Sequence, residues 1–508
     1  MAALSFFIGK GGVGKTTLSS AYAVEAALRR RKERVLLLST DPAHSLADVF
    51  QVKLGDQPKR VALGGAQLWL WQVNADQQFR RFLAGNRDAI LTLVESGTIF
   101  SRAEIEPLLD TTLPGMAEMS ALLAIHDLLE SGEYARVVVD TAPIGHTLRL
   151  FEMPEHFAKF LDFLDVAAGR DAVLAAHFGG RVTRLSQPFI AEWRRMVNAV
   201  SAALTDGETR VTLVTTPETF ALNESVRVAQ QMREAEAPMA VTDIVLNKVV
   251  TDNRRCATCH KRAGEQRKAL SFLARRFRGV EVRTAPDPGH PFLGPEQLAA
   301  LGARVYRDRA LRLKPPQPRK AAVKLAKAKW PALEAPLSLT LGKGGVGKTT
   351  VSAALAFHAR RAQPKVPVTI CSTDPAPSLD DIFEKAVDDR GVTVLGDARF
   401  RAMELDAVAE FRSWAERMKR KLDEALGTEV QGVHVDLTLD REIFAALLDI
   451  VPPGVDELFA IFRILDLLEA RRGRVVIDMA PTGHALDLLR MPDRMLLWSR
   501  LLLKSLAP

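Results

Sequence analysis

The chain has 508 residues, 47% of them hydrophobic and 26% charged, which is the composition of an ordinary globular protein. This length exceeds what one typical core organises, so we expect two domains. The net charge of +8 lies almost entirely in residues 312–329, which carry seven basic residues and no acidic one. The rest is near neutral and has no apolar run of ~18 residues, so we expect neither nucleic-acid binding nor a transmembrane segment.

The N-terminal residues MAALSFFIGK run from a short apolar stretch straight into a glycine-rich motif, without the basic start and cleavage region of a signal peptide. Only three cysteines occur, which fits a reducing compartment. One of them, Cys371, lies in an apolar strand pattern and is expected to be a buried core residue. We therefore predict a cytoplasmic protein and leave open a peripheral attachment to the inner face of the membrane.

Short apolar runs alternate with longer helical patterns along the chain. Continuous runs of this kind are typical of parallel strands that are covered on both faces. They occur at residues 4–8, 34–38, 136–139, 211–214 and 243–246. The alternation predicts an α/β fold with doubly wound, mainly parallel sheets and with ligands at the carboxyl ends of the strands.

The segment GKGGVGKTT, Gly9 to Thr17, follows the first predicted strand and opens a helix, which is the context of a phosphate-binding P-loop. Glycines let backbone N–H groups surround the phosphates, and the helix N-terminus favours their negative charge. We expect Lys15 to contact the β- and γ-phosphates of ATP and the Thr16 hydroxyl to bind Mg²⁺. The predicted nucleotide-binding residues are Gly11, Gly12, Val13, Gly14, Lys15, Thr16 and Thr17.

Lys10, directly after the first glycine, is typical of the deviant Walker A class of dimeric ATPases. It resembles the signature lysine of that class, which reaches the nucleotide of the facing subunit. Asp41 resembles the switch I aspartate that positions the attacking water. Asp140 ends an apolar strand and resembles a Walker B aspartate, which holds Mg²⁺ through water. The alternative for both aspartates is a helix N-cap.

The same motifs recur in the same order later in the chain. Gly9 corresponds to Gly342 and Asp41 to Asp374 at an offset of 333, and Asp140 corresponds to Asp478 at 338. Near-constant offsets indicate a tandem duplication, and we expect an intramolecular pseudo-dimer that could oligomerise further. Lys343 is then expected to serve the first site and Lys10 the second. The second site is predicted to comprise Gly344, Gly345, Gly347, Lys348, Thr349 and Thr350, with Asp374 catalytic and with Thr349 and Asp478 as magnesium ligands.

The repeat also predicts the domain boundaries. We expect a first P-loop ATPase domain at 1–311, a basic linker rich in proline, alanine and lysine at 312–336, and a second P-loop ATPase domain at 337–508. The second copy reaches only the counterpart of about residue 170 of the first. This second unit is therefore expected to be incomplete at its C-terminal end, with an open sheet edge and a site that binds nucleotide weakly or through the phosphates alone.

The motifs GKGGVGKTT, STDPAHSLADVF and DTAPIGHTLRL together resemble the ArsA-type anion-pump ATPase family, which includes the tail-anchored-protein targeting ATPase. The resemblance implies hydrolysis of ATP with Mg²⁺. It implies a partner that is either a membrane anion permease or a tail-anchored client. It further implies that Asn247 recognises adenine and that Pro286 belongs to a loop that closes over the base.

Cysteine placement bears on two further implications of the resemblance. Cys256 and Cys259 resemble a CxxC pair that supplies half of a tetrahedral zinc site, so Zn²⁺ would be shared between two molecules. A reduced, unliganded pair and a redox pair remain alternatives. The family's metalloid site uses three thiolates in its middle regions, but residues 104–124 and 440–461 contain no cysteine. Arsenite activation is therefore not predicted.

The leading prediction is an ATP-hydrolysing motor or switch that couples hydrolysis at the pseudo-dimer interface to an anion permease or a client protein. The alternative is a nucleotide-gated targeting or holdase module for apolar membrane-protein segments. Met116, Met119 and Leu122 have helical spacing and could line a client groove, but such stripes are more often core, and we expect core.

Overall fold

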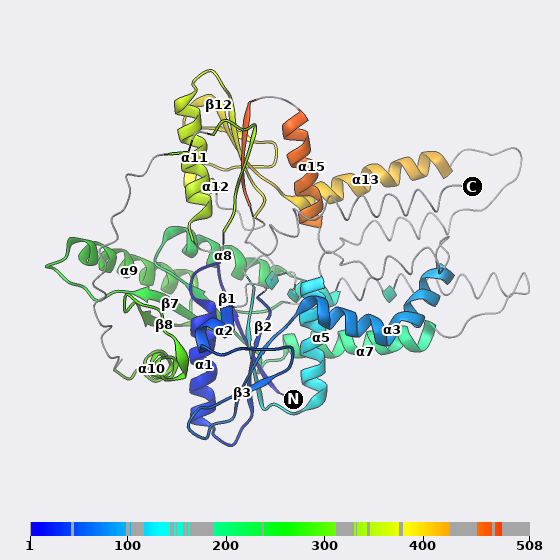
Figure 1. Ribbon diagram of the computed structural model, residues 1–508, viewed down its shortest axis with the longest axis vertical. Coiled ribbons are helices and arrows are strands. Elements are labelled where there is room, and N and C mark those ends of the chain that lie inside the picture. The colour runs from blue at the N-terminus through cyan, green and yellow to red at the C-terminus, as the bar shows by residue number, and fades with distance from the viewer. Residues whose placement is uncertain are drawn as a thin grey trace, which may run out of the picture.

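The computed structural model describes residues 2–41, 45–97, 102, 116–142, 147–148, 150–155, 158, 161–162, 186–235, 238–310, 330–331, 333–342, 346–374, 379–426, 455–469 and 473–479. These residues form two α/β units, one built on an eight-stranded sheet and one on a five-stranded sheet. Figure 1 shows the first unit in blue to green and the second in yellow to red. The predicted fold class is confirmed.

The first sheet has the strand order β3-β4-β2-β5-β1-β6-β7-β8. Every neighbouring pair is parallel except β3 with β4. Its strands are β1 (Ala3–Ile8), β2 (Val35–Ser39), β3 (Lys59–Val61), β4 (Leu68–Gln72), β5 (Arg136–Asp140), β6 (Arg210–Thr215), β7 (Asp243–Val249) and β8 (Glu281–Pro286). The five predicted strands correspond to β1, β2, β5, β6 and β7, whereas β3, β4 and β8 were not predicted.

Helices cover both faces of this sheet. They are α1 (Lys15–Arg29), α2 (Ser45–Phe50), α3 (Ala75–Gly97), α5 (Met116–Ser131), α7 (Ser186–Thr205), α8 (Thr219–Glu234), α9 (Ala257–Arg276) and α10 (Gly294–Arg307). Alternate strand residues enter opposite cores: Phe7 packs with α1, α2 and α10, whereas Phe6 and Ile8 pack with α5, α7, α8 and α9. Because both faces are buried, the strands read as continuous apolar runs in the sequence.

The second sheet repeats the central part of this topology in the order β11-β12-β10-β13-β9. Its strands are β9 (Leu337–Thr340), β10 (Val368–Ser372), β11 (Val392–Val394), β12 (Asp397–Glu404) and β13 (Arg474–Asp478), and its helices are α11 (Lys348–Ala362), α12 (Leu379–Phe383), α13 (Ala407–Leu426) and α15 (Val455–Glu469). Cys371 is buried in β10, and this burial raises the pKa of its thiol to about 12. The prediction of a core cysteine is confirmed.

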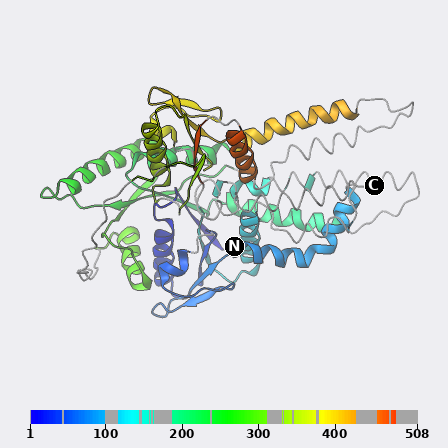
Figure 2. The same ribbon diagram turned by 45° about the horizontal axis from the view of Figure 1, so that its top comes forward.

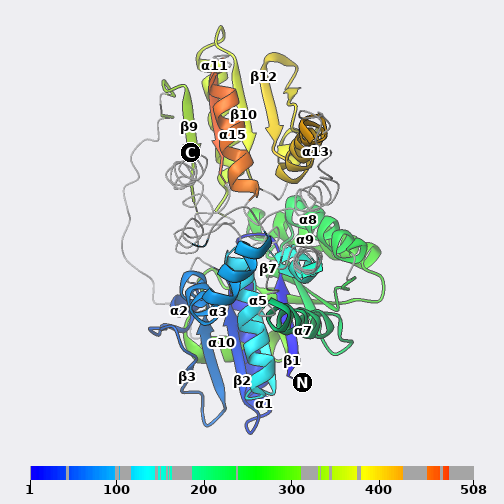
Figure 3. The same cartoon turned by 90° about the vertical axis from the view of Figure 1, so that its right-hand side faces the viewer.

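The two units face each other across α8. Figure 1 and Figure 3 show the strands of the first sheet running toward the second unit, with α8 between the sheets. Helices α3, α7 and α13 extend away on one common side of the molecule (Figure 2). In parallel α/β sheets the carboxyl ends of the strands carry the ligand sites, so the ligand side of the first sheet faces the second unit.

Candidate functional site

The first P-loop lies between the end of β1 and the start of α1, and two of its glycines are required by their surroundings. Gly9 has a φ of 154°, and a Cβ there would lie 2.3 Å from the carbonyl oxygen of Val214. Gly14 caps α1 in the left-handed region with a φ of 97°, and a Cβ there would lie 2.3 Å from the side-chain nitrogen of Asn247. The loop therefore packs directly against β6 and β7, and a side chain at either position would displace it.

Lys15 closes the loop from inside. Its side chain is buried, and its Nζ donates to the carbonyl oxygens of Gly9 at 2.8 Å and Lys10 at 3.3 Å. The ammonium thus lies within the curve of the loop, where the phosphates of a nucleotide bind in P-loop proteins. The contact of Lys15 with the β- and γ-phosphates stays a prediction.

Asp140 lies at the carboxyl end of β5, next to the loop. Its carboxylate is fully buried, its Oδ1 accepts no hydrogen bond from the part of the chain that the structure describes, and its Oδ2 accepts one from the Ser39 hydroxyl at 3.4 Å. A buried, unpaired carboxylate oxygen is costly unless a ligand satisfies it. The hydroxyl of Thr16, which lies 3.2 Å from that of Ser45, supplies a second oxygen. Both donors are hard oxygens, so the pair fits Mg²⁺.

Ser39 was not predicted as a functional residue, and it links the two acidic groups of the site. Besides donating to Asp140, its Oγ accepts the backbone N–H of Asp41 at 3.4 Å. Asp41 lies two residues beyond the end of β2 and is partly exposed. One hydroxyl therefore links Asp41 to Asp140, the predicted magnesium ligand.

Burial, together with the negative charge of Asp41, raises the pKa of Asp140 to about 7, although Thr16, Lys15 and Ser19 favour the ionised form. In the unfolded chain this carboxyl has a pKa of about 3.8. The folded protein without metal thus binds one more proton than the unfolded chain between these two values. Its free energy of unfolding falls as the pH rises through that window, by ~1.4 kcal/mol for each pKa unit of difference.

We predict that Asp140→Asn raises the melting temperature of the nucleotide-free protein at pH 8 but changes it little at pH 4, because the amide carries no buried charge. Thermal unfolding in EDTA at both pH values measures this effect. Adding Mg²⁺ at pH 8 should stabilise the parent protein and not the variant. A variant that is equally destabilised at both pH values would contradict the assignment of the raised pKa to Asp140.

The second unit reproduces the same constellation. Asp478 at the end of β13 accepts from the Ser372 hydroxyl at 3.5 Å, and the Ser372 Oγ accepts the backbone N–H of Asp374 at 3.3 Å. The Ser352 hydroxyl donates to Asp478 at 2.9 Å. Burial raises the pKa of Asp478, with Thr349 and Ser352 opposing that rise. Lys348 is buried, as Lys15 is.

Some predicted site residues lie outside the described residues. These are Lys343, Gly344 and Gly345. Gly347 is described and caps α11 in the left-handed region with a φ of 93°, which matches Gly14, and Thr350 lies in the first turn of that helix. The action of Lys343 at the first nucleotide site therefore stays a prediction.

The residues predicted for the base side of the pocket reach the loop from β7 and β8. The Asn247 side-chain nitrogen donates to the carbonyl oxygen of Val13 at 2.7 Å. Pro286 ends β8 and pairs with Val249 of β7. Asn247 is thus held against the P-loop, while Pro286 stands at the neighbouring strand end. Their contacts with a base stay predictions.

The cysteine pair lies away from the loop, at the start of α9. Cys256 is the N-cap residue and Cys259 lies in the first turn, and both are half-buried free thiols. Hydrogen bonds from the backbone and thiol of Cys259 lower the pKa of the Cys256 thiol. Among the described residues no group of three or more histidine, cysteine or acidic side chains could hold a metal. The sharing of Zn²⁺ between two molecules stays a prediction.

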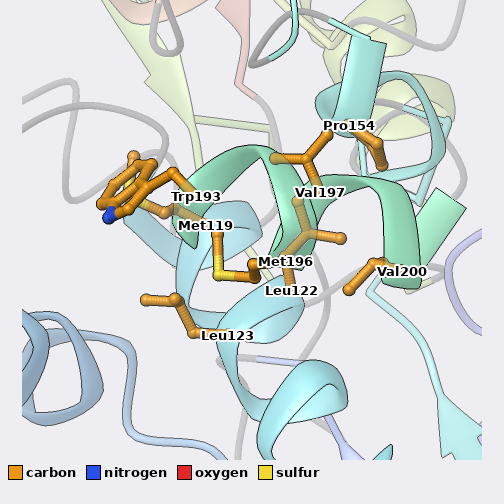
Figure 4. Close-up of a pocket in the computed structure, with 8 residues that line it drawn as sticks. All are labelled: Met119, Leu122, Leu123, Pro154, Trp193, Met196, Val197 and Val200. Carbon is orange, nitrogen blue, oxygen red and sulfur yellow. The ribbon is translucent and has the colours of Figure 1, made fainter. Parts of the chain in front are cut away.

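The expected core residues Met119 and Leu122 lie on α5 and line a small apolar pocket against α7 (Figure 4). Leu123, Trp193, Met196 and Val197 complete most of its wall. The pocket has a volume of about 10 Å³, room for about one water. Leu122 is buried in the main core. These residues pack α5 against α7, as expected of core residues, whereas the side chain of Met116 lies outside the described part of the structure.

A mainly parallel α/β sheet, a glycine loop that encloses a lysine, and a buried aspartate with one carboxylate oxygen unpaired among the described residues, beside a threonine hydroxyl, define the class of P-loop nucleoside triphosphatases. The family model described as "Anion-transporting ATPase" matches residues 2–307 and 337–506. The chain belongs to this family, whose members are ATP hydrolases.

Three relatives illustrate the extent of the similarity. ATPase ARSA1 of Chlamydomonas reinhardtii is 32% identical over 535 residues, which cover 96% of this chain and 65% of the relative. ATPase ASNA1 homolog of Dictyostelium discoideum is 29% identical over 55% of this chain and 82% of the relative. ATPase GET3 of Lodderomyces elongisporus is 28% identical over 58% of this chain and 86% of the relative. The chain spans 65% of the length of ARSA1. No helix among the described residues could cross a membrane.

Proposed function

We propose that the chain binds MgATP at its first P-loop and hydrolyses it, and that this reaction drives a change in the contact between the two units. The observation that carries the proposal is the convergence of Lys15, Thr16, Asp41 and Asp140 on one loop, because each supplies a different part of phosphoryl-transfer chemistry. The family membership of the chain supports the same activity.

Each side chain of the site has a separate role in the proposed hydrolysis. Lys15 exchanges its two carbonyl contacts for phosphate oxygens, and the backbone N–H groups of the loop bind the remaining charge. Asp41 orients the attacking water and accepts its proton as the new bond to phosphorus forms. Thr16, and Asp140 through water, would hold Mg²⁺, which neutralises charge on the phosphate oxygens when bound. Because the metal competes with the proton of Asp140, we expect Mg²⁺ affinity to fall as the pH drops below about 7.

The contact between the units supports the proposed coupling. Lys10 lies over the ring of Phe220 in α8, with its Nζ 5.3 Å from the ring centroid. One turn further along, Glu224 is buried, and burial raises the pKa of its carboxyl. The charges of Lys10 and Arg227 oppose that rise, and Asp374 of the second unit adds to it. Lys10 thus packs against α8, the helix that contacts the second unit, and this contact supports its proposed action at the second site.

Arg227 joins α8 directly to the helix that follows the second switch I segment. Its guanidinium lies 3.2 Å from Asp380 and 3.3 Å from Asp381 at the start of α12, and Asn223 donates to Asp381 at 2.9 Å. A pocket of about 970 Å³ lies beside this contact, lined by α8, α9 and α12. The pocket leaves room for the units to approach further, which is the movement we propose that ATP drives.

We predict that Arg227→Glu and Asp381→Arg each lower ATP hydrolysis, because each places like charges together across the interface. Combining them should restore much of the rate, with a coupling of about 0.5–3 kcal/mol, since both groups are partly exposed. Steady-state phosphate release in a double-mutant cycle measures the coupling. Arg233→Glu, on the same helix but bonded to its own backbone, is the matched control. Strictly additive effects of the two changes would contradict this role of the contact.

The partner is proposed to be a membrane anion permease or a client protein that responds to the state of the interface, and the chain is proposed to act in the cytoplasm at the inner face of the membrane. The alternative is a nucleotide-gated holdase for apolar membrane-protein segments. The similarity of the chain to ATPase GET3 supports this alternative. ATP hydrolysis that is stimulated by an apolar tail peptide would favour the alternative. Stimulation by arsenite alone would favour the pump role. It would contradict the expectation that arsenite does not activate the chain, which rests on the absence of cysteine from residues 104–124 and 440–461.

A further inference from the structure

β7 departs from regular strand geometry directly beside the P-loop. Lys248 has a φ of 58°, and the pairing of β7 with β8 shifts in register between Leu246 and Val249. A side chain with a Cβ disfavours this left-handed conformation, so surrounding contacts have to maintain it. The irregularity turns two consecutive side chains, Asn247 and Lys248, toward the loop instead of to opposite faces of the sheet.

These two side chains bind two consecutive carbonyl groups of the P-loop. The Lys248 Nζ donates to the carbonyl oxygen of Gly12 at 3.0 Å, and the Asn247 Nδ2 donates to that of Val13 at 2.7 Å. The irregular turn is itself secured: Arg262 donates to the carbonyl oxygen of Lys248 at 3.4 Å and pairs with Asp287 at 3.1 Å, and the Asp287 N–H donates to Val249 at 2.8 Å.

The orientation of a carbonyl fixes the orientation of the next N–H. The peptide bonds are trans, so the C=O of one residue and the N–H of the following residue point in opposite directions. With the Gly12 and Val13 carbonyls held outward against β7, the N–H groups of Val13 and Gly14 point to the other side, and that of Val13 faces the Lys10 carbonyl at 3.5 Å within the loop. Gly12, with a φ of 78°, has little intrinsic resistance to a peptide flip.

We propose that Lys248 is a positioning residue for the nucleotide: with Asn247, it fixes two successive peptide planes of the P-loop so that the Val13 and Gly14 N–H groups face the phosphates. This inference rests on the proposed function of the site. Lys15 has to give up its bonds to Gly9 and Lys10 when phosphate binds, whereas the bond from Lys248 lies on the outer side and persists. Lys248 thereby holds the loop in shape while Lys15 changes partners.

The test compares Lys248→Met, which keeps the length of the stem without the charge, Lys248→Gly, which suits the left-handed backbone, and Lys248→Arg. All are made in a full chain that carries Lys348→Ala to silence the second site. We expect the Met and Gly variants to bind MgADP and MgATP about tenfold or more weakly, because a charged hydrogen bond is lost. The kcat at saturating MgATP should change far less than KM, and the Arg variant should recover much of the affinity. Lys268→Met, an exposed lysine of α9 that pairs with Glu265, is the matched control and should leave binding unchanged.

Hydrogen exchange of the segment 9–15 in the nucleotide-free protein gives a second, independent readout. Exchange should be faster in the Met and Gly variants, although the Gly variant should not melt below the parent, because its backbone strain is relieved. Parent-like exchange, or parent-like nucleotide affinity, in Lys248→Met would overturn the inference. A parent chain that binds no nucleotide would instead refute the proposed function, while the exchange data would still decide whether Lys248 holds the loop.

Discussion

Lys15→Ala is expected to lower ATP hydrolysis at the first site by about 10²–10³-fold, the loss typical of removing one charge-stabilising donor from a preorganised site. The ammonium is buried inside the loop, where it donates to the carbonyl oxygens of Gly9 and Lys10 and can exchange them for phosphate oxygens. Phosphate release under single-turnover conditions measures the effect. Because a second P-loop lysine exists, the measurement is made with Lys348→Ala in both chains.

The control for this change is Lys32→Ala, an exposed lysine just beyond α1 that lies far from the loop in sequence and should leave the rate unchanged. Thermal melting of each variant separates loss of chemistry from loss of fold. If the Lys15→Ala chain, with Lys348 also replaced, still released phosphate at the parent rate, the first loop could not be the site of hydrolysis.

Asp41→Asn is expected to lower kcat by about 10²–10⁴-fold while nucleotide binding is retained, since an amide keeps the size of the side chain but cannot accept a proton from water. The backbone N–H of residue 41 keeps its bond to Ser39 in either case, so the switch segment stays in place. The variant also removes a charge that raises the pKa of Asp140, so Mg²⁺ should bind it at a lower pH than it binds the parent. Calorimetry with MgATP and phosphate release measure binding and turnover in parallel.

Asp48→Asn serves as the comparison, because Asp48 is an exposed carboxyl a few residues further along the same switch region, in α2. It should leave kcat close to that of the parent. Undiminished hydrolysis by Asp41→Asn, or an equal loss in both variants, would refute the role assigned to Asp41.

Sequence patterns were sufficient for the parts of the molecule that depend on local chemistry. The apolar runs predict five strands of the first sheet because both faces of that sheet are buried. The P-loop glycines are recognisable because β6 and β7 leave no space for a Cβ at Gly9 and Gly14. Cys371 follows from its apolar strand in the same way.

Other features depend on tertiary geometry and could not be predicted. The strands β3 and β8 have few apolar residues, so nothing in their sequences distinguishes them from loops. Ser39 is an unremarkable serine until β2 and β5 are paired, which places its hydroxyl beside Asp140. The role of Lys248 requires a register shift between β7 and β8.

The contact of Arg227 with Asp380 and Asp381 is even harder to predict, because it joins residues more than 150 positions apart in two different units. No local pattern marks α8 as the helix between the sheets, and its charged residues read as an ordinary solvated face. Only the packing of one unit on the other turns them into an interface.

The most direct test of the account is phosphate release from ATP by the purified full chain, measured under single-turnover conditions with Mg²⁺ and then with EDTA. The account predicts release that requires Mg²⁺, slows by about 10²–10⁴-fold in Asp41→Asn, and falls as the pH drops below about 7, where the proton on Asp140 competes with the metal. A chain that binds ATP and releases no phosphate with Mg²⁺, or one that releases it equally well in EDTA, would contradict the central claim.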